Sequence, residues 1–94
     1  GTPITIAPEV AAGAAPTPAS DWYAVGVMLY EALTGAPPFV GTAEEILRSK
    51  QHTSPLPVRE RAPNAPVDLA ELCDRLLDRD PQKRTPIADG LEAP

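Results

Sequence analysis

The sequence lacks the features that would place it among secreted or membrane proteins. It contains a single cysteine, so no disulfide can form within the chain, and this favours a reducing compartment such as the cytoplasm. Its central apolar run, from Trp22 to Tyr30, covers only nine residues, whereas a membrane span needs about 20. No signal peptide or lipidation motif is present. We therefore expect a cytoplasmic protein with no membrane segment in this chain.

Positive charge is also scarce. The formal net charge is −5, and no basic cluster exceeds two adjacent residues. Nucleic acids and anionic membranes attract proteins through clustered lysine and arginine. The composition therefore predicts no nucleic-acid partner. The single histidine, His52, has no neighbour at a metal-ligand spacing, so we also expect no metal site.

No stretch alternates between apolar and polar residues, so the sequence offers no candidate β-strand. What it does contain is proline: 13 of 94 residues, and these fall between helical patterns. A chain of this length forms one domain at most. We therefore expect an all-α fold, in which a central helix and about three shorter helices are joined by ordered, proline-rich loops.

The strongest helical pattern covers residues 19–35. Ser20 is a good N-cap residue, and Asp21 follows it, where the helix dipole favours a negative charge. Gly35 provides a left-handed stop before two prolines. Between these signals nearly every side of the helix is apolar, as in a helix enclosed by other elements. The pattern predicts a buried central helix that the remaining chain surrounds.

Shorter helices are expected on both sides of this one. We expect a single helical turn within residues 8–12. Residues 42–45 form a capping box that begins a helix reaching about residue 50. Residues 51–66 are polar and proline-rich, and they predict a loop. Two further helices should begin at the apparent capping box of residues 68–71 and at the Thr-Pro pair of residues 85–86.

The helix after residue 68 has a recognisable apolar face. Leu69, Leu72, Cys73 and Leu76 recur at the i, i+3, i+4 and i+7 spacing of one helical side. We expect this face to be buried. Cys73 should then act as a packing residue, since a thiol in apolar surroundings is unreactive.

Three separated motifs together resemble the C-terminal lobe of protein kinases. Gly1-Thr2-Pro3 and the following Ala-Pro-Glu resemble the end of a kinase activation segment, and residues 20–39 resemble the central helix of the lobe. Residues 76–85 resemble the late motif whose arginine closes it. The resemblance covers essentially residues 1–94 as a partial kinase domain, and it is greatest to bacterial serine/threonine kinases.

The resemblance implies roles for particular residues. It places a substrate-docking loop at Thr2, Pro3, Ile4, Thr5 and Ile6, with the Thr2 hydroxyl shaping the site for hydroxyl substrates. It implies that Glu9 pairs with Arg84 and that Asp21 accepts amides of the catalytic loop. Kinases usually carry a tyrosine where Thr5 stands, so this docking loop departs from the family pattern. The implied structural residues are Ala7, Pro8, Glu9, Asp21, Trp22, Gly26 and Arg84.

The motifs that perform phosphoryl transfer are absent from these 94 residues. There is no Gly-x-Gly-x-x-Gly, no His-Arg-Asp and no Asp-Phe-Gly. The resemblance therefore implies ATP and Mg²⁺ for the intact kinase only, with no cofactor and no catalytic residue in this part. The implied partners are the missing N-terminal part of the kinase domain and a protein substrate. Without that missing part, we expect an exposed apolar patch on the central helix.

Two other interpretations remain open. The chain could be a non-catalytic, kinase-like module that binds a partner through the uncovered helix. It could also be an unrelated small helical bundle, which would have no contact between Glu9 and Arg84. An upstream reading frame that encodes the catalytic motifs would favour the kinase, whereas a start codon immediately before Gly1 would favour the interaction module.

Overall fold

The computed structural model describes residues 2–84, and within them it contains helices and loops without a β-strand. The all-α prediction is therefore confirmed for this part of the chain. The helix expected at residues 85–86 lies outside the described residues. The elements are α1 (Pro8–Ala11), α2 (Pro18–Thr34), α3 (Ala43–His52), α4 (Val58–Arg61), α5 (Val67–Leu76) and the 3₁₀ helix η1 (Pro81–Lys83).

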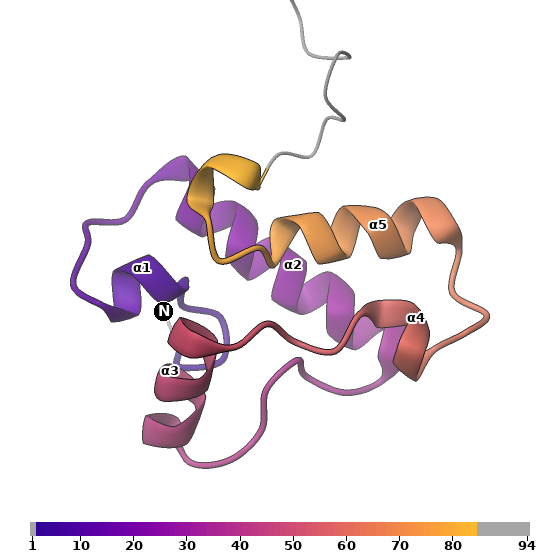
Figure 1. Cartoon of the computed structure of the whole chain (residues 1–94), viewed down its shortest axis with the longest axis horizontal. Helices are drawn as coiled ribbons and strands as arrows, with labels where there is room; N and C mark the ends of the chain where they lie inside the picture. The colour runs from indigo at the N-terminus through magenta and orange to yellow at the C-terminus, as the bar shows by residue number, and fades with distance from the viewer. Residues whose placement is uncertain (1, 85–94) are drawn as a thin grey trace, which may run out of the picture.

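Helix α2 runs through the middle of the fold, with α4 and α5 on one side of the view and α1 and α3 on the other (Figure 1). Helices α4 and α5 pack against α2 and against each other, and η1 contacts α2 as well. Helices α1 and α3 pack together on the other side of the molecule. Within residues 2–84, no helix combines the length and apolar character that a membrane crossing requires.

Helix α2 begins earlier than the sequence indicated. Its N-cap is Thr17, whose hydroxyl accepts a hydrogen bond from the Ser20 amide, while the Ser20 hydroxyl accepts one from the Thr17 amide. The prediction of Ser20 as N-cap was wrong because this reciprocal box places it at the third helical position. The C-terminal prediction is confirmed, since Gly35 adopts φ +80° and its amide donates to Glu31.

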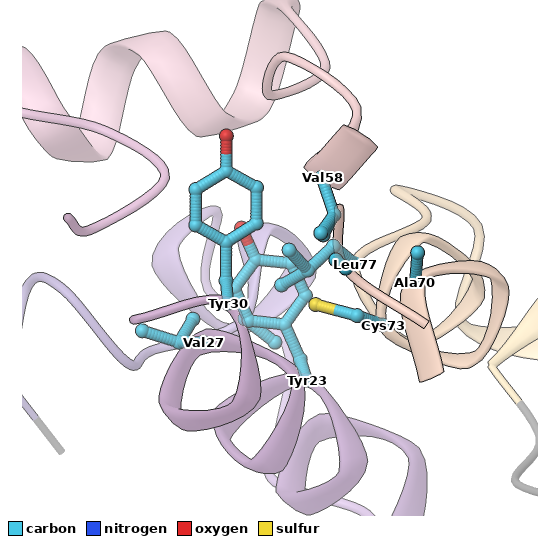
Figure 2. Packing of buried hydrophobic residues seen from close by; sticks show 9 residues of the cluster. Tyr23, Val27, Tyr30, Val58, Ala70, Cys73 and Leu77 are labelled. Atoms are coloured by element: carbon cyan, nitrogen blue, oxygen red, sulfur yellow. The ribbon is translucent and has the colours of Figure 1, made fainter. Parts of the chain in front are cut away.

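The apolar core lies where α2 crosses α5 (Figure 2). A Cβ atom built on Gly26 would lie 2.9 Å from Leu76 Cβ and 3.1 Å from Leu77 Cδ2. Glycine is therefore needed at this crossing, because any side chain would push the two helices apart. The buried apolar residues around the crossing are Tyr23, Val27, Tyr30, Val58, Ala70, Cys73, Leu76 and Leu77.

Helix α5 differs from its prediction at its start and on its buried face. It begins at Val67 after Pro66, and the Asp68 carboxylate accepts only from the adjacent Leu69 amide, so the expected capping box is absent. Leu69 is 39% exposed, and Ala70 is buried in its place. The buried face of α5 therefore includes Ala70 and Cys73, which pack in the cluster with Tyr23 and Val27. Cys73 is buried, as expected.

Residues 51–66 contain a helix that sequence patterning missed. Helix α4 has only four residues, too few to show a helical period. Polar contacts hold it in place: the Val58 amide donates to Asp74 Oδ1 at 3.1 Å, and the Tyr30 hydroxyl donates to the Leu56 carbonyl at 2.7 Å. Val58 is thereby buried in the core.

One side of α2 is not covered. Trp22 and Val25 are 37% and 38% exposed, and Met28 is 58% exposed. These residues lie three apart and therefore share a side of the helix. The expectation that other elements enclose α2 on every side was wrong for the described residues, because these three side chains stay accessible although α4, α5 and η1 pack against α2. Exposed apolar residues on this helix match the expected patch.

Candidate functional site: the N-terminal loop and its anchors

The expected docking loop forms a compact turn at the start of the chain. The amides of Thr5 and Ile6 both donate to the Thr2 carbonyl, at 3.1 and 2.9 Å. The hydroxyls of Thr2 and Thr5 lie 3.1 Å apart and share a hydrogen bond. Thr2 and Ile4 are exposed, whereas Pro3, Thr5 and Ile6 are partly buried. The five residues therefore fold as one unit with Thr2 and Ile4 accessible.

Ala7 and Pro8 connect this loop to the rest of the molecule. Both are buried, and Ala7 belongs to the cluster that contains Tyr23 and Val27. Ala7 is the N-cap of α1, and Pro8 occupies its first turn, where a missing amide hydrogen costs nothing. The turn expected at residues 8–12 is confirmed. It directs the Glu9 side chain toward the C-terminal part of the chain.

Glu9 and Arg84 form a two-pronged ion pair across 75 positions of sequence. Arg84 Nη1 donates to Glu9 Oε2 and Arg84 Nη2 donates to Glu9 Oε1, both at 2.7 Å. The Arg84 side chain is completely buried, and that of Glu9 is 20% exposed. The contact that the resemblance implies is therefore present. An unrelated bundle without this contact is excluded.

Every N–H donor of Arg84 has an acceptor. A guanidinium carries five N–H donors. Two donate to Glu9, and Nε donates to the Asp78 carbonyl at 2.6 Å. The remaining two donate to the carbonyls of Ala19 and Arg79, at 3.3 and 3.2 Å. Because burial of an unpaired donor is costly, this full set makes a buried arginine tolerable.

The pair changes the acidity of Glu9. Partial burial raises the pKa of Glu9. The hydrogen bonds and the positive charge of Arg84 lower the pKa by more than burial raises it, so it lies below the usual 4.5. Glu9 is therefore ionised at neutral pH, and the bidentate geometry is the one in which arginine binds a carboxylate most strongly.

Lys50, on α3, makes a second buried anchor that the sequence analysis missed. It is 0% exposed, and its Nζ donates to the carbonyls of Pro3, Ile4 and Ile6 at 2.6, 3.0 and 2.7 Å. Burial lowers the pKa of Lys50 to about 8, so the amine is still protonated at neutral pH. A signal was available, because Lys50 follows the buried Ile46 by four positions and so lies on the same helical face.

Tyr23 lies between the two anchors. Its ring centroid is 5.2 Å from Lys50 Nζ and 4.9 Å from Arg84 Cζ, within the range of cation–π attraction. Burial raises the pKa of Tyr23 to about 12, although the charge of Arg84 opposes this shift. One aromatic residue of α2 therefore contacts both cations that hold the N-terminal segment.

The other implied structural residues lie on α2. Asp21 is exposed in the first turn, where a negative charge suits the helix dipole. Trp22 belongs to the uncovered side, and Gly26 belongs to the α5 crossing. Asp21 lines a shallow pocket together with Thr5, Ile6 and Ala7, so it lies beside the docking loop, whereas Trp22 remains exposed.

Comparison with known proteins gives a consistent result. The family model described as "Protein kinase domain" matches residues 1–94. The serine/threonine-protein kinase PkaA of Streptomyces coelicolor is 42% identical over 92 residues, which is 97% of this chain and 16% of that protein. The serine/threonine protein kinase ypkA of Aspergillus fumigatus is 44% identical over 89% of this chain and 13% of its own length.

A mouse relative extends the match to the full chain. The serine/threonine-protein kinase ULK3 of Mus musculus is 38% identical over 100% of this chain and 20% of its own length. The chain therefore spans a fifth or less of the length of these three relatives.

Proposed function

Because the chain belongs to the protein kinase domain family, we propose that it is the docking and scaffold part of a serine/threonine kinase C-lobe. In the intact protein, the domain would transfer the terminal phosphoryl group of ATP to a serine or threonine hydroxyl of a protein. Residues 1–94 would form the C-terminal part of that domain. Cytoplasmic location belongs to the same proposal.

The Glu9–Arg84 pair is the observation that supports this proposal most strongly. It joins the segment directly after the docking loop to the end of the described chain. A two-pronged pair with a fully buried guanidinium is an unusual arrangement in so short a chain, since buried arginine requires many matched acceptors. It occurs at the two positions that the family resemblance selects.

Within this proposal, the N-terminal turn binds the acceptor protein. Thr2 would contribute to the choice of hydroxyl substrates, and Pro3 to Ile6 would shape the peptide groove. Asp21 would accept amides of the catalytic loop, which fits its exposed position in the first turn of α2. Ala7, Pro8, Glu9, Trp22, Gly26 and Arg84 would support the site structurally.

The described residues do not fit ATP and Mg²⁺ by themselves. The 94-residue sequence contains no glycine-rich phosphate loop, and residues 2–84 contain no group of three His, Cys, Asp or Glu side chains that could hold a metal ion. We therefore assign both ligands to the remainder of the kinase domain. The 94-residue chain alone is expected to transfer no phosphate.

The partner that we propose for the uncovered side of α2 is the N-terminal part of the same kinase domain. Trp22, Val25 and Met28 expose large apolar surfaces there, and such surfaces mark sites that bind another protein surface. Addition of a polypeptide carrying that part should make the Trp22 fluorescence shift to shorter wavelength. An unchanged spectrum would contradict this assignment.

The same exposed residues favour one alternative function, a non-catalytic kinase-like module that binds a partner through α2. The two functions differ in the sequence upstream of Gly1. A reading frame that encodes the phosphate-binding lysine, His-Arg-Asp and Asp-Phe-Gly supports the kinase. A frame without them supports the interaction module.

The direct test is phosphorylation of a generic acceptor protein by the product of the complete reading frame. With ATP and Mg²⁺ we expect incorporation on serine or threonine, and none with the 94-residue chain. Thr2→Val should reduce incorporation more than Thr2→Ser, which keeps the hydroxyl. Equal activity of the two variants would contradict the role of Thr2, and absence of any activity would contradict the kinase proposal.

A further inference from the structure

The fold buries a lysine without giving it a carboxylate. Among residues 2–84, no acidic side chain lies within ion-pair distance of Lys50, although its side chain is completely enclosed. An isolated ammonium group is costly to bury, so its partners must be strong acceptors. Its acceptors are three carbonyl oxygens, and all three belong to residues 3–6.

The Lys50 ammonium group has one carbonyl acceptor for each of its N–H donors. An ammonium group has three N–H donors, and the carbonyls of Pro3, Ile4 and Ile6 lie 2.6–3.0 Å from Nζ. Three carbonyls of a four-residue segment can converge on one atom only when the backbone is tightly turned. The turn closed by the Thr2 carbonyl supplies that geometry. The buried charge and the loop conformation therefore depend on each other.

Lys50 contacts the loop from its buried side. Lys50 belongs to α3, which is separated from the loop by more than 40 positions of sequence. It approaches the loop from the buried side, while Thr2 and Ile4 are exposed on the loop itself. Lys50 therefore contacts the loop backbone without occupying its accessible surface.

We propose that Lys50 is a positioning residue for acceptor recognition: its ammonium group fixes the conformation of residues 3–6 and thereby determines how well an acceptor peptide binds. This inference rests on the proposed function of that loop as the peptide-docking site. Lys50 acts through the loop and touches neither the peptide nor the reacting phosphate. Loss of its charge should weaken peptide binding and leave ATP binding unchanged.

Lys50→Met removes the three donors while keeping a stem of similar length, and Lys50→Arg keeps charge and donors. Lys83→Met is a matched control, because Lys83 is the only other lysine and is exposed. In the product of the complete reading frame, we expect Lys50→Met to raise the KM for an acceptor peptide about tenfold, which is roughly 1.4 kcal/mol. The KM for ATP should not change, and Lys50→Arg should recover part of the loss.

A second measurement follows the loop itself. In the 94-residue chain, amide hydrogen exchange at Thr5 and Ile6 reports on the turn, because both amides donate to Thr2. Lys50→Met should accelerate exchange at these two amides at least tenfold, while Val27 in the core of α2 stays protected. Uniform acceleration at all three amides would show a general loss of stability and would overturn the positioning role.

The two proposals fail in different ways. If the complete protein phosphorylates the peptide but Lys50→Met has the wild-type KM, the inference about Lys50 is overturned and the kinase proposal stands. Parallel changes in both KM values would also overturn it. If the wild-type protein phosphorylates nothing, the proposed function is overturned, and with it the recognition role of Lys50.

Discussion

Two parts of this molecule are stabilised by different kinds of interaction. The crossing of α2 with α5, with α4 beside it, is held by apolar side chains packed around Gly26. The N-terminal segment, residues 2–11, is held by two buried cations, Lys50 and Arg84, while Ala7 belongs to the apolar cluster and Val10 packs against it. Apolar packing has no direction, whereas each cation here requires particular oxygen atoms. The conformation of the N-terminal segment is therefore determined more by directional hydrogen bonds than by apolar packing.

This difference suits the two tasks that we assign to them. A scaffold must resist unfolding, and apolar burial supplies most of the free energy for that. A docking loop must have one conformation while its outer surface stays accessible. Backbone carbonyls bound from the inner side meet both requirements. Tyr23 joins the parts, since its ring belongs to the core and contacts both cations.

The largest effect should come from breaking the Glu9–Arg84 pair. Arg84→Met leaves the Glu9 carboxylate without its partner and should lower the free energy of unfolding by about 3–5 kcal/mol. Urea unfolding followed by circular dichroism measures this. Arg48→Met is the matched control, because its pair with Glu44 is largely exposed and such pairs contribute about 0.3–0.5 kcal/mol. Equal losses in the two variants would contradict the importance of burial.

A core substitution should lower the free energy of unfolding by no more than Arg84→Met does. It should, however, accelerate amide exchange in a different part of the chain. Leu77→Ala removes buried atoms beside Gly26 and should cost about 3 kcal/mol. Because the core is shared by the whole fold, amide exchange should accelerate at α2 and α5 together. After Arg84→Met, by contrast, exchange should accelerate first in residues 4–11. If amide exchange accelerated in the same order in both variants, the claim that the two parts are stabilised by different interactions would be wrong.

Gly26→Ala tests the closeness of the helix crossing. Alanine normally stabilises a helix interior relative to glycine by up to about 1 kcal/mol. Here the new methyl group would lie 2.9 Å from Leu76 Cβ, an atom fixed to the α5 backbone. The crowding should reverse the sign and cost about 1–3 kcal/mol. A gain in the urea midpoint would show that α5 sits farther from α2 than described.

The pH dependence of the free energy of unfolding should reveal the contribution of ionised Glu9. Its pKa is lower in the folded chain than the usual 4.5, so the folded state holds this proton less tightly than the unfolded state does. The contribution of the pair is therefore complete above pH 5 and declines as the pH falls through the folded value. Glu9→Gln should flatten this part of the stability curve. An identical acid dependence in both proteins would contradict the assignment.

Local sequence patterns predicted helices in both parts of the molecule and missed features of both. The existence of α2 and its Gly35 stop follow from local patterns, although its Thr17 N-cap was missed, and the capping box of Thr42 and Glu45 at the start of α3 was found. The start of α5 did not, because Pro66 precedes a helix without any side-chain cap. Helix α4 depends on hydrogen bonds to distant residues, which no local pattern records.

The two anchors also depend on contacts that no local pattern records. The Glu9–Arg84 pair was expected from family resemblance alone, since nothing local relates two residues 75 positions apart. Lys50 matched neither a motif nor an expected burial pattern, because lysine is almost never fully buried. Its position four residues after Ile46 gave the only hint. The loop carbonyls that accept from it cannot be identified from residue types, since every residue has one.

The most direct test of the account is nuclear magnetic resonance of the side-chain amines. The chain has two lysines, Lys50 and Lys83, so labelling lysine with nitrogen-15 gives two ammonium signals. If Lys50 is buried and donates to the loop carbonyls, its protons should exchange with water at least tenfold more slowly than those of Lys83 at pH 6–7, and Lys50→Met should abolish the slow signal. Two signals that exchange at the same rate would contradict a docking loop held by a buried cation.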